Sequence, residues 1–391
     1  MRIIQVIPHY IPAHRFGGPL RVAHPLGKAL TNLGHQVVVC TTNLADEHND
    51  LSVPVDQPVN VEGVTVYYEP TLLSRYWGFS PKLWRRSAQE IQKADLVLVH
   101  AHYQFANWAG AFLARRYRKP YIIFPHASLR RQGLQHKSPR KKQIYLTLLE
   151  RRNLEKAMFI AFNAPEEKAD SLFGKRGRVV PSGIDPSEFN NRPASGYFRQ
   201  QYPQLQNKVV YLFLGRLDVK HKGLDFLIPA FAQLHRSNPN THLVLAGPDE
   251  DDGSTQIDTL IHQHNLSQSV TLTGLISGQD KLAALQDADV FVLSSRFEGL
   301  SIALLEALYF GLPMLVTDRV GLCHEIQRYQ AGLVTSATTE AIYQGLSQLA
   351  EANTRKSMKG RGTHLILKNY TWDIIASNLM SQIQDLVPEC I

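Results

Sequence analysis

Cysteine is scarce in this sequence, and the few cysteines lie far apart. The 391 residues include three of them, Cys40, Cys323 and Cys390. An odd number of widely separated cysteines supplies neither a disulfide framework nor the closely spaced ligands of a zinc site. The pattern excludes a small disulfide-stabilised module and fits a reducing compartment.

Long apolar runs are also missing. No stretch approaches the ~20 apolar residues that a helix needs to cross a bilayer. The first residues, Met1–Ile7, form too short an apolar run for the core of a secretory signal, and Pro8 interrupts it. We therefore expect a cytoplasmic protein, for which peripheral binding to the inner face of the plasma membrane is the alternative to a fully soluble state.

The dinucleotide fingerprint G-x-G-x-x-G is absent from the place where it would be expected. Residues Arg2–Ile7 and Gln36–Thr41 read as strands on either side of a helix at Leu20–Leu33, which predicts a Rossmann-like βαβ opening. The loop after the first strand carries only Gly17 and Gly18, so NAD binding is not expected. Adjacent glycines let a backbone approach a ligand closely, although a plain flexible loop is the alternative.

Composition and charge set further bounds. The chain is too long for one ordinary core, so two domains are expected, and 44% hydrophobic with 19% charged residues is typical of a globular protein. Residues 1–205 hold 28 Lys and Arg against 15 Asp and Glu, a net charge of +13, and the remainder carries −5. The first half is therefore expected to meet an anionic partner, unless its charge only aids solubility. No nucleic-acid-binding module is recognisable.

The most informative stretch is Phe291–Leu312. An apolar strand, Asp289–Leu293, is followed by a glycine-containing turn and by a helix from about Ser301. The free N–H groups of such a helix favour an anion. Glu298 in the turn and Glu306 in the helix would lie roughly 10 Å apart along the axis, so they could reach different parts of one ligand. The alternative is a turn residue and a solvated helix face.

Two cations flank an earlier turn. A strand at Val209–Leu214 leads through Arg216 to Lys222, and a helix is expected at Gly223–Arg236. A guanidinium and an ammonium that converge on one turn suit a diphosphate and would neutralise it as a leaving group. The alternative is that both are surface charges beside a turn.

Histidines mark the ends of two predicted strands in the first half. His126 follows Tyr121–Pro125, and His100 and His102 flank the end of Asp95–His100, where ligands gather in open α/β sheets. An H-x-H pair can bind a metal, but no third ligand is evident nearby, so no metal site is expected. His126 could also be a structural histidine at a strand end.

Two basic segments of the first half have alternative readings. Leu72–Trp84 is aromatic and basic, which fits either an amphipathic element at a membrane interface or an element that packs on the core. A second run is either a solvated helix face or a docking surface for an anionic acceptor, and we favour docking. Its members are Arg130, Arg131, His136, Lys137, Arg140, Lys141, Lys142, Arg151 and Arg152.

Taken together, these pieces resemble the retaining family-4 glycosyltransferases, which have a GT-B fold. The hallmark Glu-x7-Glu element occurs here in order after the Arg/Lys element, and the resemblance is densest over 209–321 and 121–163. The segments that carry it are YLFLGRLDVKHKGLDFLIPAF (211–231), LVLAGPDED (243–251), VTLTGLISGQDKLAALQDADVFVLSSRFEGLSIALLEALYFGLPMLVTD (270–318), Gly321 and PHASLRRQGLQHKSPRKKQIYLTLLERRNLEKA (125–157).

The resemblance implies a role for each element of the site. Glu298 would hold hydroxyls of the donor sugar, and Glu306 would bind the ribose of the donor nucleotide. Arg216 and Lys222 would bind the diphosphate, and His126 would lie near the reacting centre. The implied catalytic residues are His126, Arg216, Lys222 and Glu298. The implied donor-binding residues are Gly17, Gly18, Arg216, Lys222, Gly247, Leu275, Phe297, Glu298, Gly299, Leu300, Ser301 and Glu306.

The resemblance also implies fold and reaction. It predicts two Rossmann-like α/β domains that face each other across a cleft, an acceptor-side domain at 1–190, a linker at 191–207 and a donor-binding domain at 208–369, with a last helix within 370–391 that crosses back to the first domain. The implied reaction moves a hexose, glucose by preference, from a UDP-sugar to a saccharide or lipid-linked acceptor of polysaccharide biosynthesis with retention, and needs no cofactor or metal. The alternatives are a GT-B-fold nucleotide-sugar epimerase and a non-catalytic nucleotide-sugar-binding protein.

Overall fold

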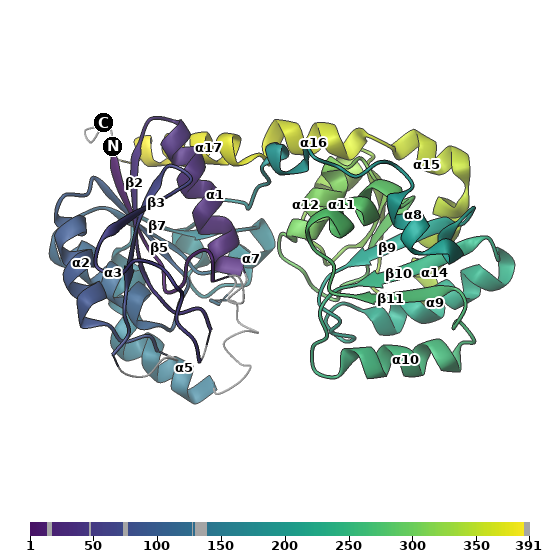
Figure 1. The fold of residues 1–391 in the computed structure, drawn as a ribbon, viewed down its shortest axis with the longest axis horizontal. Coiled ribbons are helices and arrows are strands. Elements are labelled where there is room, and N and C mark those ends of the chain that lie inside the picture. Colours follow the sequence, from purple (N-terminus) through teal and green to yellow (C-terminus); the bar gives the residue numbers. More distant parts are fainter. Residues whose placement is uncertain (14–17, 47, 73–76, 127, 130–138, 387–391) are drawn as a thin grey trace. The chain divides into compact units, whose positions relative to one another are not determined.

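The structure, a computed structural model, describes residues 1–391 except 14–17, 47, 73–76, 127, 130–138 and 387–391. The chain folds into two compact α/β units (Figure 1). One unit consists of Met1–Gly183 and Trp372–Ile391, and the other of Ile184–Thr371. The expected pair of parallel-sheet α/β domains is confirmed.

A parallel sheet forms the centre of the first unit, with strand order β3-β4-β2-β1-β5-β6-β7-β8, in which only the edge strand β3 runs antiparallel to its neighbour. Its strands are β1 (Arg2–Val6), β2 (Gln36–Thr42), β3 (Pro58–Val61), β4 (Val64–Glu69), β5 (Leu96–His100), β6 (Tyr121–Phe124), β7 (Phe159–Phe162) and β8 (Gly177–Val179). The helices are α1 (Gly18–Asn32), α2 (Pro81–Gln92), α3 (Phe105–Arg116), α5 (Pro139–Tyr145), a π-helical turn (Leu146–Glu150), α6 (Arg151–Lys156), α7 (Pro165–Ala169), a 3-10 turn (Gly174–Arg176) and α17 (Trp372–Gln384).

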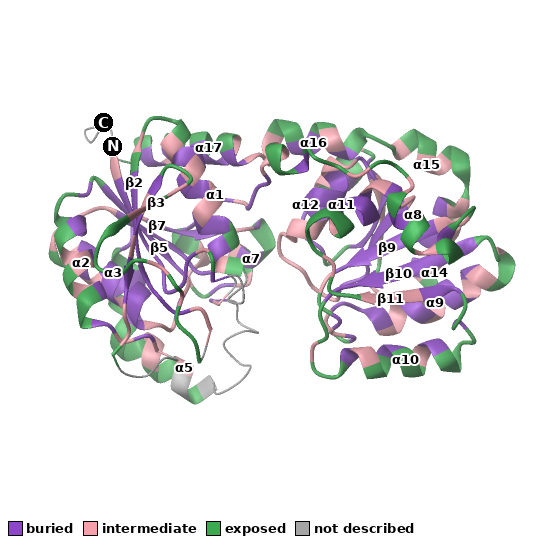
Figure 2. Ribbon diagram, in the orientation of Figure 1, coloured by how far each residue is buried: buried purple, intermediate pink, exposed green. Residues whose placement is uncertain are grey.

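Helices cover both faces of this sheet, which explains why its strands are almost continuously apolar. One face packs against α1 and α17, and the other against α2, α3 and α6. Ile375 and Leu379 of α17 lie in the same core as Ile3 of β1, so the predicted return of the last helix to the first unit is confirmed. Figure 2 shows the strands buried beneath helices with exposed outer faces.

A second parallel sheet, with strand order β11-β10-β9-β12-β13-β14, forms the other unit. Its strands are β9 (Val209–Leu214), β10 (Thr241–Ala246), β11 (Val270–Gly274), β12 (Val290–Leu293), β13 (Met314–Thr317) and β14 (Gly332–Thr335). Its helices are α8 (Tyr197–Gln201), α9 (Leu224–Ser237), α10 (Gly253–Gln263), α11 (Gly278–Asp287), α12 (Ile302–Tyr309), α13 (Cys323–Arg328), α14 (Thr339–Ala350), α15 (Ala352–Met358) and α16 (Arg361–Asn369), with 3-10 turns at Pro186–Phe189 and Pro203–Leu205.

The segment expected to be a linker, 191–207, is instead part of the second unit. Phe198 and Leu205 are buried in its core. The Asp287 carboxylate accepts hydrogen bonds from the backbone N–H groups of Gly196 and Phe198 at 2.6 and 2.8 Å. Because most residues of the segment are polar, its composition predicted a linker despite these few anchoring residues.

In the aromatic segment Leu72–Trp84, the rings of Trp77, Phe79 and Trp84 pack against the core of the first unit, whereas Leu72 is exposed. Trp77 and Phe79 stack with ring centroids 6.3 Å apart, and both rings meet Phe105 of α3. The ring centroid of Trp84 in α2 lies 5.9 Å from that of Trp108, which also belongs to α3. In the parts of the chain that the structure describes, no helix combines the length and the hydropathy of a membrane span.

Candidate functional site

The sheet order of the second unit fixes where a ligand site is expected. From β9 the chain proceeds outward to β10 and β11 on one side, and β12, β13 and β14 lie on the other. The carboxyl ends of β9 and β12 therefore form the switch point at which open α/β sheets bind ligands. Lys222 follows β9 and Glu298 follows β12, so two predicted residues come from the loops at this point.

Lys222 and Glu298 form an ion pair at the switch point. Their side chains are 9% and 17% exposed, respectively. The Ser295 hydroxyl approaches the same carboxylate at 3.5 Å. The ion pair places a cation and an anion side by side at the switch point. Each of the two groups can form hydrogen bonds beyond the pair.

Close backbone contacts hold the two loops together. Gly223 has a φ of +65°, and a Cβ there would collide with the carbonyl oxygen of Ser294. The Ser294 hydroxyl in turn donates to the carbonyl of Lys222 at 2.9 Å. Only glycine accommodates both the left-handed conformation and this approach, so the sequence Lys222-Gly223 is needed to bring the ammonium to the β12 loop.

His221 belongs to the same arrangement, although the sequence analysis did not single it out. Its ring stacks on Phe297 with centroids 4.3 Å apart, and its Nε2 lies 2.9 Å from the Phe297 carbonyl oxygen. Burial, reinforced by the Lys222 charge, lowers the pKa of His221. The contact fixes Phe297 beside Glu298.

The amino end of α12 is open. Its N-cap, Ser301, makes no side-chain capping bond. Among the described residues, no group accepts a hydrogen bond from the N–H of Gly299, Leu300 or Ser301. A Cβ at Gly299 would meet no atom within 4 Å. Unpaired N–H groups at a helix start, with space in front of them, form an anion site.

Glu306 is not on a solvated helix face. The residue is 6% exposed, and the ammonium of Lys281 on α11 lies 2.6 Å from its carboxylate. Lys281 was missed in the sequence because a lysine in a predicted helix carries no signal of its partner. The Lys281 ammonium thus fixes the Glu306 carboxylate and compensates its buried charge.

Arg216 and Lys222 do not share one partner. Arg216 pairs with Glu250, in the loop after β10, and is about half exposed. The loop after β10 lies so close to the loop after β9 that a Cβ at Gly247 would collide with the carbonyl oxygen of Gly215. Leu275, the last of the predicted residues on this edge, follows β11 and is exposed.

His126, a predicted site residue of the first unit, follows the carboxyl end of β6. His126 Nε2 is 3.2 Å from His100 Nδ1, and burial lowers the pKa of His126 to about 4. His126 has a φ of +48°, a left-handed conformation that is rare for non-glycine residues. Gly18 is the first residue of α1, and Gly17 lies outside the described residues.

No group of three or more potential metal ligands occurs within the described ranges. His102 packs edge-on against Tyr103, with ring centroids 4.6 Å apart. Burial lowers the pKa of His102 to about 3. His100, the other member of the H-x-H pair, stacks on Phe124 with ring centroids 4.7 Å apart.

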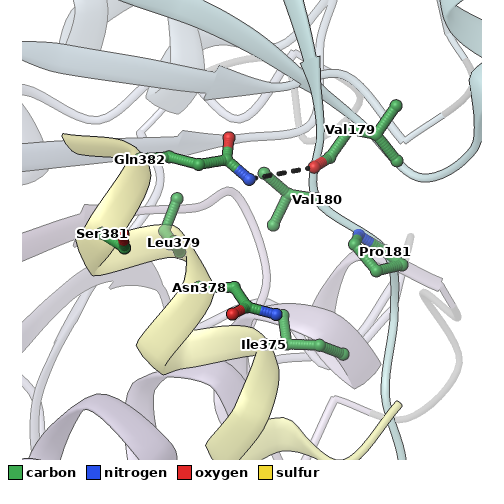
Figure 3. Close-up of a pocket in the computed structure, with 8 residues that line it drawn as sticks. All are labelled: Val179, Val180, Pro181, Ile375, Asn378, Leu379, Ser381 and Gln382. Atoms are coloured by element: carbon green, nitrogen blue, oxygen red, sulfur yellow. Dashed lines mark hydrogen bonds between the residues drawn. The ribbon is translucent and has the colours of Figure 1, made fainter. Parts of the chain in front are cut away.

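A cavity of about 270 Å³ lies elsewhere in the first unit, between the end of β8 and α17. Figure 3 shows its lining, in which the Gln382 amide donates to the carbonyl of Val179 at 3.3 Å. None of the predicted site residues lines it.

Family models match both halves of the chain. The model for glycosyl transferases group 1 matches residues 197–364, and the model for glycosyltransferase family 4 matches residues 16–188. The mannosylfructose-phosphate synthase of Agrobacterium fabrum is 25% identical over 98% of this chain and 91% of its own length.

Solved structures share the fold over nearly the whole chain. The sucrose-phosphate synthase of Thermosynechococcus elongatus superposes with a TM-score of 0.72 at 21% identity, over 99% of each chain. The Anabaena protein HepE in complex with UDP superposes with a TM-score of 0.74 at 16% identity, over 98% of this chain and 100% of its own.

Proposed function

The chain belongs to family 4 of the glycosyltransferases, with the GT-B fold, and on that basis we propose that it transfers a hexose, preferentially glucose, from a UDP-sugar with retention of configuration. The acceptor in this proposal is a saccharide or lipid-linked oligosaccharide of polysaccharide biosynthesis. The reaction uses no cofactor and no metal.

One observation carries the proposal: the Lys222–Glu298 pair stands at the switch point beside the N–H groups of Gly299, Leu300 and Ser301, which have no acceptor in the part of the chain that the structure describes. A diphosphate needs a cation and oriented N–H donors, and a sugar needs a carboxylate for its hydroxyls. Both kinds of group meet at the carboxyl ends of β9 and β12. Lys222 and the N–H groups would therefore hold the diphosphate, and Glu298 the hexose.

The chemistry follows from that assignment. The bond between the anomeric carbon and the diphosphate oxygen breaks, and a bond to the acceptor oxygen forms on the same face of the sugar. The hydroxyl proton of the acceptor passes to the departing diphosphate oxygen. Negative charge grows on that oxygen, and Lys222, Arg216 and the amino end of α12 would stabilise it.

Glu306 and Leu275 complete the proposed donor site. The Glu306 carboxylate, fixed by Lys281, would accept from the ribose hydroxyls. The backbone beside Leu275 and the residue Gly247 would edge the base. His126, Gly18 and Gly17 stay predictions for the reacting centre and the diphosphate.

Titration calorimetry against UDP-, GDP- and ADP-sugars tests the donor, and NMR of the product's anomeric proton tests retention. We expect UDP-glucose to bind most tightly and to be hydrolysed slowly without an acceptor. Exclusive binding of a GDP-sugar would overturn the donor assignment. Interconversion of free nucleotide sugars would indicate the epimerase, and binding without any turnover the non-catalytic alternative.

A further inference from the structure

Exposed aliphatic side chains gather on the segment formed by α5, the π-helical turn and α6 (Pro139–Lys156). Ile144, Leu148 and Leu149 are 58%, 76% and 40% exposed. Single exposed leucines are ordinary on protein surfaces, whereas a contiguous group marks an interaction site. Figure 2 shows exposed residues along this segment at α5.

The π-helical turn places these side chains together. The backbone N–H of Arg151 donates to the carbonyl of Leu146, an i to i+5 bond that widens the turn by one residue. Leu148 and Leu149 therefore both lie one turn beyond Ile144. The three side chains form one ridge, which we call the aliphatic ridge.

The acidic residue of the same turn faces inward. Glu150 is 2% exposed, and Tyr145 and Asn153 donate to its carboxyl group at 3.3 and 3.4 Å. Burial raises the pKa of Glu150 to about 7. Its charge is thus withdrawn from the surface on which the ridge lies.

Basic residues bracket the aliphatic ridge. Arg140 precedes it, and Arg151, Arg152 and Lys156 follow it, all with exposed side chains. The one exposed acid of the segment, Glu155, binds Arg151 at 2.8 Å. The surface is therefore apolar at its centre and cationic at both ends.

We propose that Pro139–Lys156 docks the protein on an anionic lipid bilayer, with the aliphatic ridge at the acyl boundary and the basic residues among the headgroups. Apolar centres with cationic ends are the pattern of helices that lie in a membrane interface. A protein partner fits this surface less well, because the exposed area of three aliphatic side chains is far smaller than the ~800 Å² that each partner buries in a stable interface. The docking surface is independent of the donor chemistry.

Sedimentation of the full chain with vesicles tests the proposal. We expect binding to vesicles of equal parts phosphatidylglycerol and phosphatidylcholine, weakening with salt, and none to phosphatidylcholine alone. The triple variant Ile144→Ser, Leu148→Ser, Leu149→Ser should bind about tenfold more weakly. The pair Arg140→Gln, Arg152→Gln should lose about as much.

Matched variants separate this surface from general effects. Leu33→Ser, Leu172→Ser, Leu367→Ser removes three exposed leucines elsewhere and should bind like the wild type. Arg236→Gln, Lys356→Gln is the corresponding charge control. Circular dichroism and donor hydrolysis should be unchanged throughout, so a loss of binding would not depend on the proposed reaction.

Three results would overturn the proposal. The wild type could fail to bind anionic vesicles, or the ridge variant could bind as well as the leucine control. Alternatively, the ridge variant could convert a dimer to a monomer in analytical ultracentrifugation, which would identify the ridge as an interface between copies of the chain.

Discussion

Lys222 and Glu298, 76 positions apart in the chain, pair with each other at the carboxyl ends of neighbouring strands. Both side chains are largely buried, so each compensates the charge of the other. A donor that binds there meets polar groups already in place. The pair links the loop after β9 to the turn before α12.

The first prediction concerns Glu298→Gln, which removes the carboxylate charge and keeps its shape. Transfer and donor hydrolysis should fall by at least about 100-fold, because a hydroxyl-binding group that also orients Lys222 is lost. Steady-state kinetics measures the change. Lys222→Ala should be equally damaging. If either variant is folded and has wild-type rates, the residue that it replaces does not belong to the site.

The second prediction concerns Lys281→Met. Without its ammonium, Glu306 loses the group that fixes it, so KM for the donor should rise about tenfold while kcat changes less than about twofold. The effect should be smaller with a 2′-deoxyribose donor, since one of the ribose hydroxyls that Glu306 would bind is then absent. Equal losses with both donors would show that Lys281 does not act through the 2′-hydroxyl.

The third prediction concerns Glu250, the partner of Arg216. Glu250→Gln should strengthen UDP binding two- to fivefold in calorimetry, because the donor no longer competes with a carboxylate for the guanidinium. The gain is small because the pair is partly exposed. Arg216→Ala should weaken binding, and the double variant should resemble Arg216→Ala. A loss of affinity in Glu250→Gln would contradict the competition.

The sequence predicted the strands well because buried parallel strands such as β9 and β10 are continuous apolar runs. The carboxylates Glu298 and Glu306 were singled out by the resemblance of the ordered Glu-x7-Glu element, and their roles in binding stay predictions. Their cationic partners depend on which loops the sheet order brings together, so Lys281 could not be inferred. The same holds for 191–207, where Asp287, a distant residue, anchors a segment whose composition is that of a linker.

The fourth prediction concerns metals. Excess chelator should leave transfer unchanged, because Lys222, Arg216 and the amino end of α12 would supply the neutralisation that Mg²⁺ provides in other phosphate sites. Activity before and after chelation, with Mg²⁺ or Mn²⁺ added back, measures this. A strict requirement for either ion would contradict the proposed chemistry.

The last prediction concerns acid stability and His102. Burial lowers the pKa of His102 to about 3, whereas in the unfolded chain it is near 6.5. Between these values the unfolded chain binds more protons, so the free energy of unfolding falls as the pH is lowered. At pH 5 this one group should cost roughly 2 kcal/mol relative to pH 7.

Denaturant unfolding at pH 7 and pH 5 measures that difference in the wild type and in His102→Gln, which cannot titrate. The loss of stability on acidification should be smaller by roughly 2 kcal/mol in the variant, whatever its stability at pH 7. Gln57→Asn, at an exposed residue of the same unit that does not titrate, should lose as much as the wild type. If His102→Gln also matches the wild type, His102 is protonated without cost in the folded chain, and its burial against Tyr103 cannot be as the structure has it.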